Sequence, residues 1–151
     1  KSYVWADAAE RMARIDAAVA LARQSPPPVD RADAADWVEA RLAAPQEPGV
    51  TRVLSHSIVW QYLPPEGQAR IERAMARAGA EASAGRPLAW VQLETNRETY
   101  RHELRVRSWP GVGGAEAGEW TILGTAHAHG AWVEWFGVPP PAPLVASSAQ
   151  G

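Results

Sequence analysis

The spacing of apolar residues predicts a helix near the start of the chain. Apolar residues recur every three or four positions between Ala8 and Ala22, which is the spacing of one face of a helix. Asp7 and Glu10 stand three residues apart before this run, as in a capping box. We therefore expect a helix from about Asp7 to Gln24.

A run of prolines separates this helix from the elements that follow. Residues 26–28 are all proline, and proline cannot continue a helix. Residues 29–32 then suggest a short strand. Asp33 is a suitable cap for a second helix, which should end before Pro45.

The middle of the chain predicts a strand, a helix and a second strand. Residues 50–59 are rich in β-branched side chains and hold few charges, which is typical of a strand buried on both faces. A helix begins at Pro65 or Glu66 and runs to about Ala78. Its apolar face consists of Ile71, Ala74, Met75 and Ala78. Residues 87–94 form another apolar strand, so the order predicts a right-handed βαβ unit.

The last third of the chain changes to shorter strands. Residues 102–109 alternate polar and apolar side chains, and residues 120–125 and 131–136 are two further strand candidates, which together predict an antiparallel meander. We expect one α/β domain over residues 1–136 and a flexible Pro-rich tail over residues 137–151. Because the chain lacks an initiator Met and enters a helix almost at once, we also expect it to be a piece of a longer protein.

Composition narrows the classes of function. The formal net charge of the 151 residues is −2, so we expect neither a nucleic acid nor a membrane as partner. With no cysteine, chemistry must come from histidine, carboxylates and hydroxyls. We expect a cytoplasmic protein, because no apolar run approaches the roughly 20 residues of a membrane span and no signal peptide opens the chain.

A polar triplet interrupts the apolar segment VLSHSIVWQY at residues 53–62. His56 is either a general base at the end of a strand or a partly buried histidine whose ring nitrogens are bonded within the protein. Ser55 and Ser57 point to the opposite face, since neighbours on a strand alternate. Glu94 ends the next apolar strand, where it either orients His56 or is an exposed loop acid.

Two further histidines and the tryptophans suggest other chemistry. His127 and His129 are spaced so that both can ligate a metal from one side of a strand, with Glu134 or Glu94 as a third ligand. Gly130 suggests a turn that would spoil this alignment, so we expect no metal, with one histidine tethering the turn. The eight tryptophans either line an aromatic pocket or fill the core.

Several segments resemble the C-terminal half of an uncharacterised bacterial family, domain of unknown function 2332. The most specific marks are His56-Ser57 before an apolar Tyr-Leu-Pro and the sequence His-Gly-Ala-Trp at residues 129–132. The resemblance covers about residues 4–136. The segments that carry it are residues 4–23, 33–37, 55–64, 87–90 and 127–135. Full-length members are longer, and the resemblance implies an upstream glycine-rich segment that is absent here.

The succession of elements also resembles the second half of the Rossmann-like methyltransferases that use S-adenosylmethionine. This resemblance implies a sheet in the order third, second, first, fourth, fifth, seventh, sixth strand, with helices packed on it. It also implies that the cofactor is S-adenosylmethionine or a related nucleoside, with His56 as base and Glu94 orienting it. The cofactor-binding residues that it implies are Asp33, Ala34, Ser55 and Ser57.

Three functions therefore stay open. The first is a methyltransferase-like domain for an unknown small-molecule substrate, with only half of the cofactor pocket in this chain. The alternative is a non-catalytic binding module on the same fold, and a third is metal-assisted hydrolysis through His127 and His129. Because strands of the longer protein are missing, residues 50–59 would form a bare sheet edge, covered by the N-terminal segment or by a second copy in a homodimer.

Overall fold

The computed structural model of the chain describes residues 9–111 and 116–137, and the chain divides into two compact units, residues 1–32 and 33–151. In the first unit, α1 (Ala9–Gln24) matches the predicted helix and buries none of its residues. The predicted capping residue Asp7 and the predicted tail from residue 138 lie outside the described residues. The strand expected at residues 29–32 is wrong, because this segment pairs with no strand and Val29 is exposed.

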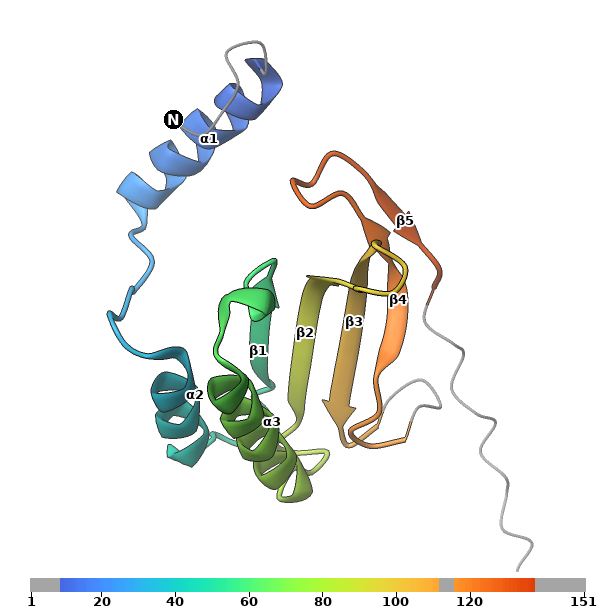
Figure 1. Cartoon of the computed structure of the whole chain (residues 1–151). Helices are drawn as coiled ribbons and strands as arrows, with labels where there is room; N and C mark the ends of the chain where they lie inside the picture. The colour runs from blue at the N-terminus through green and yellow to red at the C-terminus, as the bar shows by residue number, and fades with distance from the viewer. Residues whose placement is uncertain (1–8, 112–115, 138–151) are drawn as a thin grey trace, which may run out of the picture. The chain divides into compact units, whose positions relative to one another are not determined.

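The second unit is a mixed α/β fold, in which two helices pack on one face of a five-stranded sheet, toward the side of its first strands (Figure 1). Its elements are α2 (Ala34–Ala43), β1 (Arg52–Ser57), the 3-10 helix η1 (Trp60–Tyr62), α3 (Pro65–Ala80), β2 (Leu88–Thr95), β3 (His102–Trp109), β4 (Thr121–Ala126) and β5 (Val133–Trp135). In the described part of the chain, none of the helices combines the length and the apolar character that crossing a bilayer requires.

The strands lie in the order β1-β2-β3-β4-β5. β1 and β2 are parallel and joined through α3, while each later strand is antiparallel to its neighbour. The predicted parallel pair and the predicted meander are therefore confirmed. The later strands follow chain order, whereas the methyltransferase order would place its last strand beside the fifth, so this part of the sheet lends no support to that resemblance. β1 is an edge of the described sheet, and the cover of that edge by the N-terminal segment or by a second copy stays a prediction.

Local sequence explains where the helices begin and how they are joined. Oδ1 of Asp33 accepts hydrogen bonds from the N–H groups of Ala35 at 2.9 Å and Asp36 at 3.1 Å, which confirms the predicted cap of α2. Pro65 opens α3, where its missing N–H costs nothing. Arg70 of α3 donates to Glu39 and Asp36 of α2. These hydrogen bonds lower the pKa of the Glu39 carboxyl and raise the pKa of Arg70.

The burial of β1 differs from the prediction. Its exposure alternates along the strand, so that Leu54 packs against the helices while Val53 on the other face is 52% exposed. The expectation that this strand is buried on both faces is wrong. The apolar composition of the strand suggested two covered faces, but α2 and α3 cover a single face. Nothing in the described part of the second unit covers Val53.

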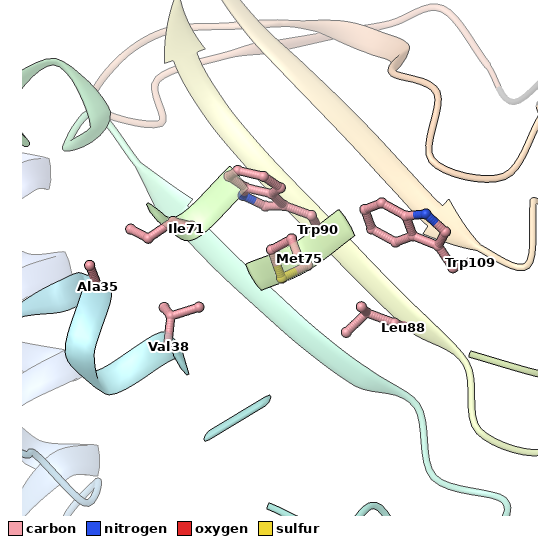
Figure 2. Close-up of a cluster of buried hydrophobic side chains, with 7 residues drawn as sticks. All are labelled: Ala35, Val38, Ile71, Met75, Leu88, Trp90 and Trp109. Atoms are coloured by element: carbon pink, nitrogen blue, oxygen red, sulfur yellow. The ribbon is translucent and has the colours of Figure 1, made fainter. Parts of the chain in front are cut away.

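The core lies between the helices and the sheet (Figure 2). Met75 of α3 and Trp90 of β2 are completely buried. Ile71 and Ala74 of the predicted apolar face are buried too, and Ala78 is partly buried against the same cluster. Each large side chain buried in this way contributes roughly 1.5–3 kcal/mol. Trp90 therefore ties the helical layer to the strand that also carries Glu94.

Trp109 fits its indole ring between two glycines. A Cβ atom added to Gly79 of α3 would lie 2.5 Å from Cε2 of this ring, and one added to Gly118 would lie 2.6 Å from its Nε1. Neither position has room for a methyl group, because real Cβ atoms do not approach other heavy atoms so closely. Glycine at residue 79 is thus a packing requirement of the core.

We predict that Gly79→Ala lowers the free energy of unfolding by about 1–3 kcal/mol, because the added methyl group must displace the buried Trp109 ring. Gly67→Ala in the same helix is the matched control, since its Cβ would meet only Cδ of Pro64 at 3.8 Å. That control should leave stability unchanged or raise it by up to about 1 kcal/mol. Urea-induced unfolding measures both changes, and equal stability of the two variants would contradict this packing.

Candidate functional site

His56 and Glu94 meet at the carboxyl end of the parallel strands. The register pairs His56 of β1 with Gln92 of β2, so Glu94 lies one pleat further along on the same face. Nδ1 of His56 is 2.7 Å from Oε1 of Glu94, and each side chain is only 12% exposed. Open α/β sheets bind ligands outside the carboxyl ends of their parallel strands. The structure therefore brings the two predicted residues together at an edge suited to a ligand.

A third residue, Trp90, fixes the proton on the histidine ring. Nε1 of Trp90 lies 2.9 Å from Nε2 of His56 and donates to it. An indole N–H only donates, so Nε2 must present a lone pair and Nδ1 must carry the proton that it donates to Glu94. His56 is thus neutral in this arrangement, and its contact with Glu94 is a hydrogen bond. The pair carries a net charge of about −1 from the carboxylate alone.

The sequence analysis counted Trp90 among the tryptophans of a core or an aromatic pocket, but it did not predict the hydrogen bond to His56, although the position of Trp90 in the strand gave a usable signal. Trp90 and Glu94 are four residues apart on β2, so their side chains share a face. In the parallel register Trp90 pairs with Leu54, two residues before His56. What the spacing alone could not show is that the indole N–H points along the sheet toward the imidazole.

Glu94 also holds the backbone that follows β1. Its Oε1 accepts hydrogen bonds from the N–H of Val59 at 3.0 Å and of Trp60 at 3.1 Å, in addition to that from His56. These N–H groups lie at the start of η1, where a helical turn leaves donors without partners inside the turn. Hydrogen bonds to an ionised acceptor are stronger than neutral ones. One carboxylate oxygen from β2 thus fixes the turn after β1.

The turn that Glu94 holds is strained at Ile58. Ile58 has a φ of +49°, in the left-handed region that costs a residue with a side chain about 1–2 kcal/mol. Its N–H still donates to the carbonyl of Leu93 at 2.9 Å. Strained backbone of this kind persists where surrounding contacts determine it, and it concentrates at ligand sites. Here the contacts come from Leu93 and Glu94 of β2.

An open pocket of about 450 Å³ lies against this turn, and we call it the Glu94 pocket. Its lining residues are Trp60, Gln61, Leu63, Pro65, Gln68, Glu94, Thr95 and Arg97. Nε2 of Gln68 donates to the carbonyls of Trp60 at 2.9 Å and Leu63 at 3.1 Å. The ring of Trp60 stacks on His56 with centroids 5.3 Å apart. The walls therefore come from η1, the first turn of α3 and the end of β2.

Most of the chain matches the model of a single protein family. A family model described as "Uncharacterized protein conserved in bacteria (DUF2332)" matches residues 1–135. The chain belongs to this bacterial family. The resemblance that the sequence suggested is thereby confirmed for DUF2332. Comparison with curated proteins and with solved structures gave no match.

The other residues proposed for a cofactor lie apart from the Glu94 pocket of this DUF2332 chain. Ser55 and Ser57 are exposed on the face of β1 opposite to His56, as their alternation predicted. The carboxylate of Asp33 caps α2, and Ala34 is the first residue of that helix. None of the four lines the pocket. Their role in cofactor binding stays a prediction.

His127 and His129 form a turn. The N–H of Gly130 donates to the carbonyl of His127 at 2.9 Å, and Gly130 has a φ of +72°. The N–H of His129 donates to Nδ1 of His127 at 3.1 Å, so His127 tethers the turn as the alternative interpretation expected. Within residues 9–111 and 116–137, no group of three His, Cys, Asp or Glu residues is placed to hold a metal.

We predict that His56 is the Nδ1–H tautomer in solution, because the donor-only indole of Trp90 requires an unprotonated Nε2. Nitrogen-15 NMR of the histidine rings distinguishes the two ring nitrogens. The expected spectrum assigns Nδ1 of His56 to the protonated range and Nε2 to the unprotonated range. Trp90→Phe removes the donor and should mix the tautomers. An Nε2–H tautomer in the unaltered chain would rule out the arrangement.

We predict that Glu94→Ala lowers the free energy of unfolding by about 2–4 kcal/mol, because three N–H groups lose their acceptor in a largely buried site. Glu94→Gln should cost clearly less, since its amide oxygen can accept the same three hydrogen bonds. The control is Glu98→Ala, an exposed acid nearby, with an expected change within about 0.5 kcal/mol. Urea unfolding of the three variants checks this order. A value for Glu94→Ala as small as that of the control would refute the stabilising role of the three hydrogen bonds to Glu94.

Proposed function

We propose that the chain is a non-catalytic module that binds a small molecule in the Glu94 pocket. One observation carries the proposal: both ring nitrogens of His56 are engaged, Nδ1 as donor to Glu94 and Nε2 as acceptor from Trp90. A general base needs a lone pair that is directed at the substrate. The lone pair of His56 is directed instead at the completely buried Trp90, which suits a ring that shapes a site.

The pocket has the properties of a site for a small ligand. Its volume of about 450 Å³ falls within the roughly 300–1,000 Å³ that is usual for ligand pockets, which combine apolar walls with a few placed polar groups. Trp60 and Leu63 supply apolar wall, and Glu94 supplies a fixed acceptor. The hydrogen bonds from Val59 and Trp60 to Glu94 hold this wall in place before any ligand arrives.

A methyltransferase-like activity is the second candidate, and one observation favours it. His56 and Glu94 meet at the carboxyl end of the parallel strands, where that fold faces its methyl donor and substrate. On this view His56 would exchange the Trp90 hydrogen bond for one to the substrate. S-adenosylmethionine or a related nucleoside would then be the cofactor.

The proposed function predicts that small molecules bind the chain at the Glu94 pocket, as measured by saturation-transfer NMR with a fragment library that includes S-adenosylmethionine. Gln61→Trp should abolish the signals of the bound compounds, since Gln61 is exposed and lines the pocket. Tyr62→Trp is the matched control, because the neighbouring Tyr62 is 74% exposed and does not line it. The control should leave binding unchanged.

Two outcomes would contradict the proposal. If no bound compound is lost in Gln61→Trp, the ligand site is not the Glu94 pocket. If S-adenosylmethionine binds and the chain transfers its methyl group to a second compound in a reaction that His56→Ala stops, the second candidate replaces the first.

A further inference from the structure

We infer that the ligand of the Glu94 pocket is a small organic cation of the ammonium class, an inference that rests on the proposed binding function. The first step is the charge of the site. Because Trp90 donates to Nε2 of His56, the ring is neutral and leaves the charge of Glu94 uncompensated. The Glu94 side chain is only 12% exposed, so solvent screens that charge weakly.

The neighbouring cations do not neutralise Glu94. Glu103 of β3 lies directly opposite Glu94 in the antiparallel register, and like charges in that position raise each other's energy. Glu103 has its own partners, since Nε of Arg105 and Nδ2 of Asn96 each donate to it at 2.7 Å. Arg97 lines the pocket but is exposed, and no ion pair joins it to Glu94 in the described part of the chain. Glu94 therefore has no cation bonded to it among the described residues, although Arg97 stands at the rim of the pocket.

The carboxylate is oriented so that one oxygen remains for a ligand. Oε1 accepts all three protein hydrogen bonds, from His56, Val59 and Trp60. Oε2 accepts none from the described residues, and a carboxylate oxygen has two lone pairs to offer. Because Glu94 lines the pocket, a donor group in the pocket can reach an acceptor that is already held in place.

The aromatic wall favours a cation over a neutral donor. Trp60 lines the same pocket as Glu94, and an indole ring attracts a cation placed over it, by an amount that grows as water is excluded. One side of the Trp60 ring is stacked on His56. Because this imidazole is neutral, it does not repel a cationic ligand at the ring. An ammonium group satisfies both features, the uncompensated carboxylate and the aromatic wall, whereas an anion meets repulsion from Glu94.

The test uses two matched pairs of probes, each an ammonium compound with a neutral analogue of similar shape. The pairs are choline with its carbon analogue, in which a tert-butyl group replaces trimethylammonium, and cyclohexylammonium with cyclohexanol. Dissociation constants are measured from chemical-shift changes of the Trp60 indole N–H. At least one ammonium probe should bind about tenfold or more tightly than its neutral analogue.

Substitutions at two pocket residues separate the effect of charge from the effect of shape. Glu94→Gln keeps an acceptor for His56, Val59 and Trp60 but removes the charge, so ammonium binding should weaken about tenfold or more while the neutral analogue is unaffected. Arg97→Ala removes a cation from the pocket rim and should strengthen ammonium binding about two- to fivefold. Glu98→Gln, an exposed acid outside the pocket, is the control and should change neither.

The outcomes distinguish this inference from the proposed function. If Glu94→Gln leaves ammonium binding unchanged, or if each pair of probes binds equally, the inference is wrong. If neutral library compounds bind and are blocked by Gln61→Trp while neither ammonium probe binds, the binding function stands and the cation inference falls. If no probe or library compound reaches the pocket, both are wrong.

Discussion

Three N–H groups converge on one oxygen of Glu94, and the arrangement of this part of the molecule depends on that convergence. The donors are the His56 ring and the backbone of Val59 and Trp60. They belong to β1 and to the start of η1, while the acceptor belongs to β2. The carboxylate therefore joins the end of one strand to the turn after its neighbour, and it holds Ile58 at a positive φ that an isolated chain would avoid.

The hydrogen bonds to Glu94 are connected to the hydrophobic core through His56 and Trp90. Trp90 donates to His56, is completely buried, and lies against Trp60 and Trp120 with ring centroids 5.4 Å and 5.2 Å apart. Arg107 covers Trp120 at 4.9 Å and donates to the carbonyl of Gly118 at 2.7 Å. A change that moves Trp90 would therefore release His56 and weaken its hold on Glu94. The shape of the pocket is coupled to the packing of the hydrophobic core.

The charge of the His56–Glu94 pair follows from the hydrogen bonds that the two side chains make. A histidine beside a glutamate suggests an ion pair or a catalytic dyad, yet the indole N–H on Nε2 keeps the ring neutral. Among the described residues, the carboxylate of Glu94 is thus hydrogen-bonded only to neutral donors, and it lies next to the Trp60 wall of the pocket. On our proposal, this combination suits a site that recognises a positive ligand, although a site that moves protons would contain the same His and Glu.

Much of the fold was predictable from the sequence because its elements have strong local signals. The helical spacing before Gln24, the Asp33 cap, the parallel strand pair joined through α3 and the antiparallel meander were each predicted and observed. The short strand at residues 29–32 and the two-sided burial of β1 were wrong, because both depend on distant partners. A local apolar run cannot tell whether one or two layers will cover it.

The sequence by itself determined that His56 and Glu94 end neighbouring parallel strands, since strand period and the βαβ order place both at one edge. Only the tertiary structure decided what they do there. The direction of the Trp90 indole, the strained turn at Ile58 and the sharing of one oxygen by three donors depend on side-chain orientation across strands 34 to 38 residues apart. Hydrogen-bond geometry of that kind leaves no periodic trace in a sequence, because it is set by packing.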